Sequence, residues 1–155
     1  MITRRLLLKT IGAAGTIGVA GCLSVGGEAD SCETLETEPN YRGWLDDTSN
    51  YVGTCDHRGT NSVSVQNGAK ANNAHWGFKP AAVAVSPGTT VRWEWTGNGG
   101  AHDVVAERGE FASGSPTDDA GTTFEYRFDD PGLYKYSCSP HRAMGMKGAI
   151  FVALE

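Results

Sequence analysis

The sequence lacks the cysteine pattern of a structural zinc site. Its four cysteines contain no Cys-x-x-Cys pair, and its four histidines are scattered along the chain. A structural zinc site needs four ligands at characteristic short spacings, so this class is excluded. His57 and His75 lie in polar surroundings without a thioether nearby, and we interpret them as surface residues.

The sequence also lacks an excess of basic residues and the length for a second hydrophobic core. Lys and Arg total 13 against 18 Asp and Glu, and the formal net charge is −5. The balance is more acidic still when Arg4, Arg5 and Lys9 near the N-terminus are set aside. An acidic surface argues against nucleic acid as a partner. At 155 residues we expect one folded domain and a monomer.

No apolar run is long enough to span a bilayer comfortably, because a transmembrane helix needs about 20 apolar residues. Instead, Arg4 and Arg5 precede a short, glycine-rich apolar run from Ile11 to Ala20. This order is typical of a twin-arginine export signal, and a basic amphipathic helix is the alternative. We therefore predict that residues 1–21 are a twin-arginine signal with a lipobox.

Cys22 ends the phrase Val19-Ala20-Gly21-Cys22, which resembles a lipobox. Cleavage before Cys22 would leave this residue as a new N-terminus with lipid on its sulfur. The sequence thus predicts a protein anchored through Cys22 to the outer face of the cytoplasmic membrane. An incidental cysteine at the cleavage site is the alternative, and a single lipid leaves the permanence of attachment open.

Residues 22–40 consist mostly of Gly, Ser, Glu, Asp and Thr, with scarcely any large apolar side chain. Such a composition predicts a flexible, lipidated tether before a domain over residues 41–155. Cys32 lies in this tether and Cys55 in the first part of the domain. Export to an oxidising compartment favours a disulfide between them, while two free thiols and an intermolecular bridge remain open.

After Asn61 the chain alternates β-rich segments with turn phrases, and no helical period of comparable length appears. Turn phrases such as Ser86-Pro87-Gly88 and Asp130-Pro131-Gly132 separate the segments. Several short strands at this spacing predict an all-β, antiparallel sandwich of about eight strands. The clearest segments are Ser62–Val65, Val83–Val85, Val91–Trp95, Phe124–Phe128 and Ile150–Leu154.

The candidate functional residues gather near the C-terminus. Tyr134, Tyr136 and Cys138 alternate at period two, so a strand there places all three on one face. Pro140 then bends the chain, and the following loop can fold His141 and Met146 back toward the sulfur. Thiol, imidazole and thioether are all ligands for soft or borderline metals.

His102 can supply a second imidazole from a distant β-rich segment, although by itself it reads as a polar residue at a strand end. Two imidazoles and one thiolate, with a weak thioether on the axis, form the arrangement of a blue-copper electron-transfer centre. We therefore predict one copper ion bound by His102, Cys138 and His141, with Met144 and Met146 competing for the axial position.

The run Cys138-Ser139-Pro140-His141 followed by Met146 resembles the plastocyanin-type cupredoxins, and within them the halocyanins, small blue-copper proteins of halophilic archaea. The resemblance extends from about Tyr41 to the C-terminus. It implies a Greek-key cupredoxin fold and an axial ligand at Met146, with Met144 on the outer surface of the loop. One departure is Asp103, which stands where this family commonly has an asparagine that donates hydrogen bonds between the ligand loops.

The function that follows is a one-electron carrier between redox proteins of a respiratory chain, without substrate turnover. We expect electrons to pass through the exposed edge of His141, with Met144 in a small apolar docking patch and acidic residues steering a basic partner. A copper oxidase or nitrite reductase is the first rival, and it would need an open coordination position or more metals. A copper chaperone is the second, and it would need exposed, exchangeable ligands.

Overall fold

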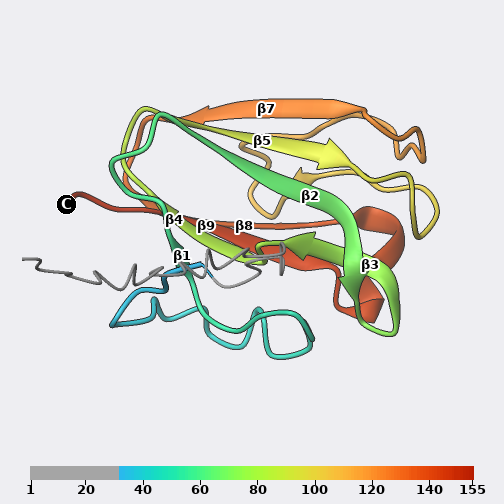
Figure 1. The fold of residues 1–155 in the computed structure, drawn as a ribbon, viewed down its shortest axis with the longest axis horizontal. Helices are drawn as coiled ribbons and strands as arrows, with labels where there is room; N and C mark the ends of the chain where they lie inside the picture. The colour runs from blue at the N-terminus through green and yellow to red at the C-terminus, as the bar shows by residue number, and fades with distance from the viewer. Residues whose placement is uncertain (1–31) are drawn as a thin grey trace, which may run out of the picture. The chain divides into compact units, whose positions relative to one another are not determined.

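The structure, a computed structural model, describes residues 32–155 (Figure 1). The predicted export signal over residues 1–21 and the predicted lipid anchor at Cys22 lie outside the described residues. Within residues 32–155, no helix combines the length and the apolar character that crossing a membrane requires.

The regular secondary structure of the described chain is almost entirely β-strand, arranged in two sheets, which confirms the predicted all-β sandwich. The first sheet has the order β1-β4-β9-β8-β6, and the second has the order β3-β2-β5-β7. A single 3-10 helix, η1 (Ser139–Met144), follows β8. The strands are β1 (Cys55–Asp56), β2 (Ser62–Ala71), β3 (Ala74–Lys79), β4 (Ala82–Val85), β5 (Thr89–Trp95), β6 (Val105–Ala106), β7 (Thr123–Phe128), β8 (Gly132–Ser137) and β9 (Lys147–Val152).

The expectation of an antiparallel sandwich is wrong in one respect, because both sheets are mixed. β1 pairs with β4, β2 with β5, and β4 with β9, all in parallel. The strand β3 was not predicted, since its sequence Ala-His-Trp-Gly-Phe-Lys shows no clear alternation. It forms a hairpin with β2 through Asn72 and Asn73, which both have positive φ (56° and 66°). Asparagine tolerates this backbone region in hairpin turns.

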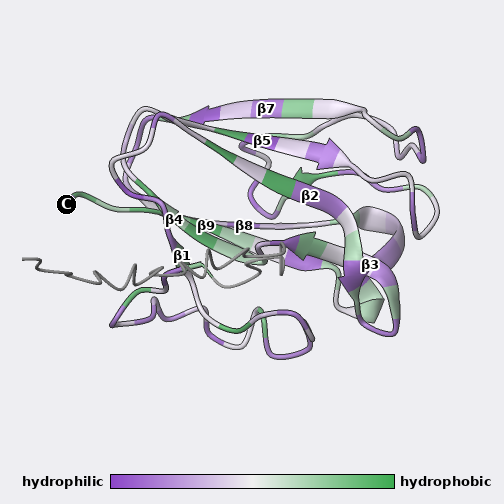
Figure 2. Ribbon diagram, in the orientation of Figure 1, coloured by the Kyte–Doolittle hydropathy of each residue, from purple (hydrophilic) through white to green (hydrophobic). Residues whose placement is uncertain are grey.

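The core lies between the two sheets and follows from strand alternation. Along β5, Val91, Trp93 and Trp95 are buried while Arg92 and Glu94 are exposed. Figure 2 shows hydrophobic and hydrophilic residues mixed along β2, β5 and β7. Ring contacts of Trp93 with side chains from other elements of both sheets fill the centre of the sandwich. These partners are Phe111, Phe124 and Tyr136.

The strand β4 is buried on both faces, because a second cluster covers the outer face of its sheet. Val83 and Val85 belong to the central core, whereas Ala82 packs with Tyr41 and Leu45 in the second cluster. A run of turns over residues 42–47 brings Tyr41 and Leu45 to this face. The segment before the first long strand is therefore part of the packed domain.

Residues 33–38 also contact the domain, ahead of the boundary that the sequence suggested at Tyr41. A disulfide joins Cys32 to Cys55, with their Cα atoms 5.4 Å apart, so the intrachain alternative is the one that the structure contains. The N–H of Leu35 donates to the carbonyl of Thr54 (2.9 Å), and Glu38 accepts from the N–H of Thr54 (2.8 Å). This segment is thus held against β1.

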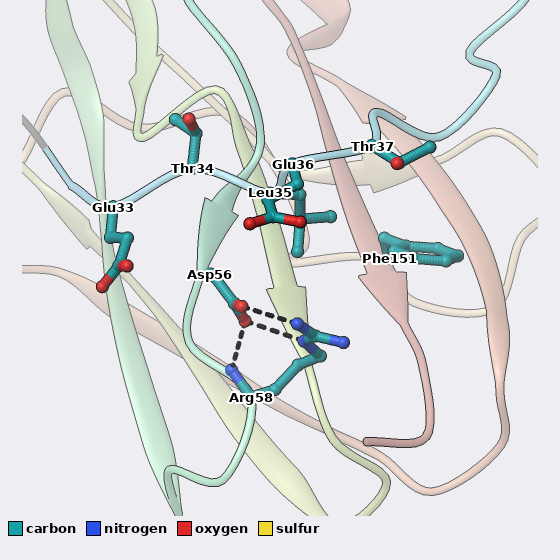
Figure 3. Close-up of a pocket in the computed structure, with 8 residues that line it drawn as sticks. All are labelled: Glu33, Thr34, Leu35, Glu36, Thr37, Asp56, Arg58 and Phe151. Carbon is teal, nitrogen blue, oxygen red and sulfur yellow. Dashed lines mark hydrogen bonds and ion pairs between the residues drawn. The ribbon is translucent and has the colours of Figure 1, made fainter.

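A pocket lies beside the same segment, between residues 33–37, β1 and Phe151 (Figure 3). The guanidinium of Arg58 pairs with the carboxylate of Asp56 at 2.7 Å across its wall. No cluster of metal-ligating side chains with suitable geometry occurs here among the described residues. The candidate site lies elsewhere in the sandwich.

Candidate metal centre

Three predicted ligands converge at one end of the sandwich. The Nδ1 atoms of His102 and His141 are 3.1 Å apart, and the Sγ atom of Cys138 lies 3.6 Å from the first and 3.5 Å from the second. Within residues 32–155, His102, Cys138 and His141 form the group of potential metal ligands whose ligand atoms lie close enough together to share one ion. His57 and His75 do not join it.

His102 is fixed in the tautomer that a metal ligand needs. Its side chain is fully buried, and its Nε2 lies 2.6 Å from the carbonyl oxygen of Asn98. A carbonyl can only accept, so Nε2 carries the proton and Nδ1 keeps its lone pair facing Cys138 and His141. The backbone of His102 is itself held by a two-way bridge to Thr117, with distances of 2.9 and 3.0 Å.

Cys138 immediately follows β8, and the loop through η1 returns the chain to it. Pro140 lies in the first turn of η1, and Gly145 ends it with φ 94°. The N–H of Met146 donates to the carbonyl of His141 (3.2 Å), and the N–H of Cys138 donates to the carbonyl of Met146 (3.1 Å). Cys138, His141 and Met146 are therefore joined by backbone hydrogen bonds, and the Met146 side chain is fully buried.

The three donors differ in their protonation state at neutral pH. Burial raises the pKa of the Cys138 thiol to about 11, although backbone hydrogen bonds from Asp103 and His141 act in the opposite direction. Burial lowers the pKa of His102, and burial together with the charge of His102 lowers that of His141. At neutral pH both imidazoles are thus neutral, and only the thiol must lose a proton to bind a metal.

Zinc affinity of the metal-free protein should therefore rise about tenfold per pH unit between about pH 7 and 9, because one proton leaves Cys138 for each metal bound. Below the ordinary pKa of imidazole the zinc affinity should depend more steeply on pH, since protons then compete with the metal at His102 and His141 as well. Competition titrations with a chelator measure this slope. A flat affinity over the upper range would show that the thiol is not a ligand, and a Cys138→Ser variant provides the flat control.

Asp103 maintains the link between the two ligand loops in a different way from the expected asparagine. Its side chain is buried, and its Oδ1 accepts a hydrogen bond of 2.6 Å from the backbone N–H of Ser139. An ionised carboxylate cannot donate but accepts strongly. The two loops are therefore still linked at this position, with Asp103 as the acceptor.

Trp76, on β3, is a site residue that the sequence did not reveal. Its ring is stacked on His141, with centroids 5.2 Å apart and planes 17° from parallel. Its indole N–H donates to the carbonyl of Gly99 (3.0 Å), which holds the ring in place. Both Trp76 and His141 are half-buried. No motif links these residues in sequence, and β3 itself was not predicted.

Met144 is an exposed residue of the loop that bears the ligands. The side chain is 43% exposed at the end of η1, whereas Met146 two residues later is buried. The two methionines of this loop are thus separated by environment, and only Met146 shares the core cluster with Cys138.

Comparison with known proteins points in one direction. A family model described as copper binding proteins of the plastocyanin/azurin family matches residues 63–153, a range that includes all four candidate ligands. The chain is 51% identical over 100 residues to a halocyanin of Natronomonas pharaonis, covering 63% of this chain and 60% of that protein. It therefore spans less than two thirds of that relative's length.

Two further matches are less similar in sequence. A plastocyanin of Scenedesmus fuscus is 34% identical over 85 residues, covering 48% of this chain and 85% of that protein. Among solved structures, an oxidized plastocyanin of Dryopteris crassirhizoma aligns with 22% identity and a TM-score of 0.44, covering 59% of this chain and all of that one.

Proposed function

Because this chain belongs to the plastocyanin/azurin family of copper binding proteins, we propose that it is a one-electron carrier with a single blue-copper site. The observation that carries the proposal is the triangle of His102 Nδ1, Cys138 Sγ and His141 Nδ1, with sides of 3.1 to 3.6 Å. Met146 is proposed as the weak axial ligand. When bound, copper supplies the one-electron Cu(II)/Cu(I) couple.

The protein's own part is to hold these donors in one arrangement for both oxidation states. His102 and Cys138 are fully buried, which excludes water from that side of the site. Hydrogen bonds to Asn98, Asp103 and the backbone of Met146 restrain the three ligand-bearing segments. A site that is assembled before the metal binds leaves little to rearrange when an electron is gained or lost.

Electrons are proposed to pass where the site approaches the surface. His141 is the half-buried ligand, and the exposed Met144 lies three residues further along the same helix. A small apolar patch at this point suits brief docking, because few contacts allow fast release. The proposed partners are redox proteins of a respiratory chain.

Met144→Lys should slow electron self-exchange between copies of the protein about tenfold, because two solvated like charges would meet where the patches dock. The visible spectrum should stay unchanged, since Met144 is not a proposed ligand. NMR line broadening in mixtures of reduced and oxidised protein measures the rate.

Leu154→Lys is the matched control for this variant. Leu154 is also an exposed apolar residue (73%), but it lies near the C-terminus, at the opposite end of the drawn domain from η1 (Figure 1). It should leave self-exchange nearly unaffected. Equal rates for the two variants would place the electron route elsewhere.

The same proposal includes a membrane location, which depends on the sequence of the N-terminal segment. Cys22→Ser should move the protein from the membrane fraction to the medium, because the lipid-bearing sulfur is lost. Replacing both Arg4 and Arg5 by Lys should block export. Immunoblots of cell fractions measure both effects, and unchanged membrane retention of Cys22→Ser would rule out the lipid anchor.

A further inference from the structure

The segment Tyr41–Tyr51 lies outside the region that the copper-protein family model matches, yet it contacts the ligand loop Cys138–Met146. Its central contact is a hydrogen bond that the hydroxyl of Thr48 donates to the carbonyl oxygen of Gly145 (2.9 Å). Thr48 is only 4% exposed, so this bond is shielded from water. Gly145 immediately precedes the proposed axial ligand Met146.

Backbone contact supports the same junction. Gly145 has φ 94°, and a Cβ atom there would collide with the carbonyl oxygen of Asp47. Only glycine both adopts this conformation readily and lets the two backbones approach so closely. The ligand loop and the Tyr41–Tyr51 segment therefore fit together without an intervening side chain at this point.

Two further contacts hold the chain just after Met146. The Nζ of Lys147 pairs with the carboxylate of Asp47 at 2.9 Å, and the indole N–H of Trp44 donates to the carbonyl of Gly148 at 2.9 Å. The Trp44 ring also lies 5.1 Å from the guanidinium of Arg142 and 5.0 Å from the Nζ of Lys147. Cations at these distances from an indole face are attracted to it.

The segment that makes these contacts is itself anchored to the rigid sheet. Tyr41 and Leu45 are buried against Ala82 and Ala149 of β4 and β9. The Tyr41 hydroxyl is 2.7 Å from the Thr54 hydroxyl, next to the disulfide-bonded Cys55. The contacts on both sides of Met146 are thus made by a segment that is itself fixed to the sheet.

We propose that the Tyr41–Tyr51 segment positions the ligand loop, and that Thr48 is the positioning residue that fixes the Gly145 carbonyl and so the backbone that presents Met146. The importance of Met146 rests on the proposed function. The restraint on the loop does not, because it is a property of the metal-free chain.

Amide hydrogen exchange in the metal-free protein tests the restraint directly. The N–H groups of Cys138, Gly145 and Met146 close the loop through hydrogen bonds to Met146, Arg142 and His141, respectively. Thr48→Ala should accelerate their exchange about fivefold, which corresponds to the loss of one ordinary hydrogen bond. Thr48→Ser should restore the slow exchange, since it keeps the hydroxyl.

Thr89→Ala is the matched control. Thr89, at the start of β5, is a buried threonine whose hydroxyl donates to a backbone carbonyl, that of Thr60 (2.8 Å), and its backbone pairs with Phe128 of β7. This variant should accelerate exchange at the three loop amides no more than at the core amide of Trp95, which is the reference for global opening. Equal acceleration of the loop amides by Thr89→Ala, or none by Thr48→Ala, would overturn the proposal.

Copper-loaded Thr48→Ala adds a second readout. Its absorption maxima or its reduction potential should shift relative to the wild type and Thr48→Ser, because the Met146 backbone is less restrained. No shift would show that the segment does not act on the ligand set. If the wild type itself formed no blue site, the proposed function would fail, while the exchange experiment would still decide the role of Thr48.

Discussion

Cys138→Ser is expected to abolish the intense blue absorption of the copper-loaded protein completely. The colour arises from charge transfer between thiolate and copper, and a serine hydroxyl is neither a soft donor nor ionised at neutral pH. The cysteine sulfur is fully buried and close to His102 and His141, so a thiol on the surface of the protein cannot take its place. Absorption spectra after titration with Cu(II) measure the effect.

The serine variant should still fold, which makes its loss of colour informative. Serine has nearly the shape of cysteine, and its oxygen can accept the backbone hydrogen bonds that Asp103 and His141 direct at this position. The matched control replaces both Cys32 and Cys55 by serine, which removes two sulfurs and the disulfide but should keep the blue band. An intensely blue Cys138→Ser variant would mean that the assigned ligand set is wrong.

Met146→Leu is expected to keep a blue site and to raise its reduction potential. A weak axial bond contributes little to holding the metal, but its loss leaves an apolar side chain facing the ion. Met146 is fully buried, and an apolar, buried surrounding disfavours the more highly charged Cu(II) state. Leucine has a similar volume, so the core should tolerate the change. Cyclic voltammetry gives the potential.

Met144→Leu is the control in the same loop. Its side chain is 43% exposed and is not part of the core cluster around Cys138, so the potential should hardly change. A large shift for Met144→Leu with none for Met146→Leu would exchange the roles of the two methionines.

The sequence predicted the features that depend on local pattern. Period-two alternation identified β5 and β8, and the spacing between Cys138 and Met146 identified a loop that returns to its start. Strand direction was mistaken because alternation is the same in parallel and antiparallel strands. The parallel pairs β2-β5 and β4-β9 join strands that are not consecutive, so no hairpin turn reveals them.

Contacts between distant segments could not be predicted in the same way. Trp76 stacks on His141 across 65 positions of sequence because the β2-β3 hairpin carries it there, and the hairpin signal was only the asparagine pair Asn72-Asn73. Thr48 donates to Gly145 from 97 positions away. A threonine in a polar turn region gives no sign that its hydroxyl will meet a particular carbonyl.

Asp103 shows a different limit. The sequence correctly indicates that a carboxylate cannot donate, but it does not indicate which groups will face it. The structure places the Ser139 N–H there, and a carboxylate is well suited to accept from it. The role of Asp103 therefore depends more on the N–H group that faces it than on its own inability to donate.

The most direct test of the carrier function is a reductive titration of the copper-loaded protein that is monitored by visible absorption. If the protein is a one-electron carrier, an intense blue band disappears after one electron equivalent per protein and returns fully on reoxidation, over repeated cycles and with no consumption of added nitrite or oxygen beyond that stoichiometry. A protein without such a band, or one that consumes many electron equivalents in substrate turnover, would contradict the carrier function.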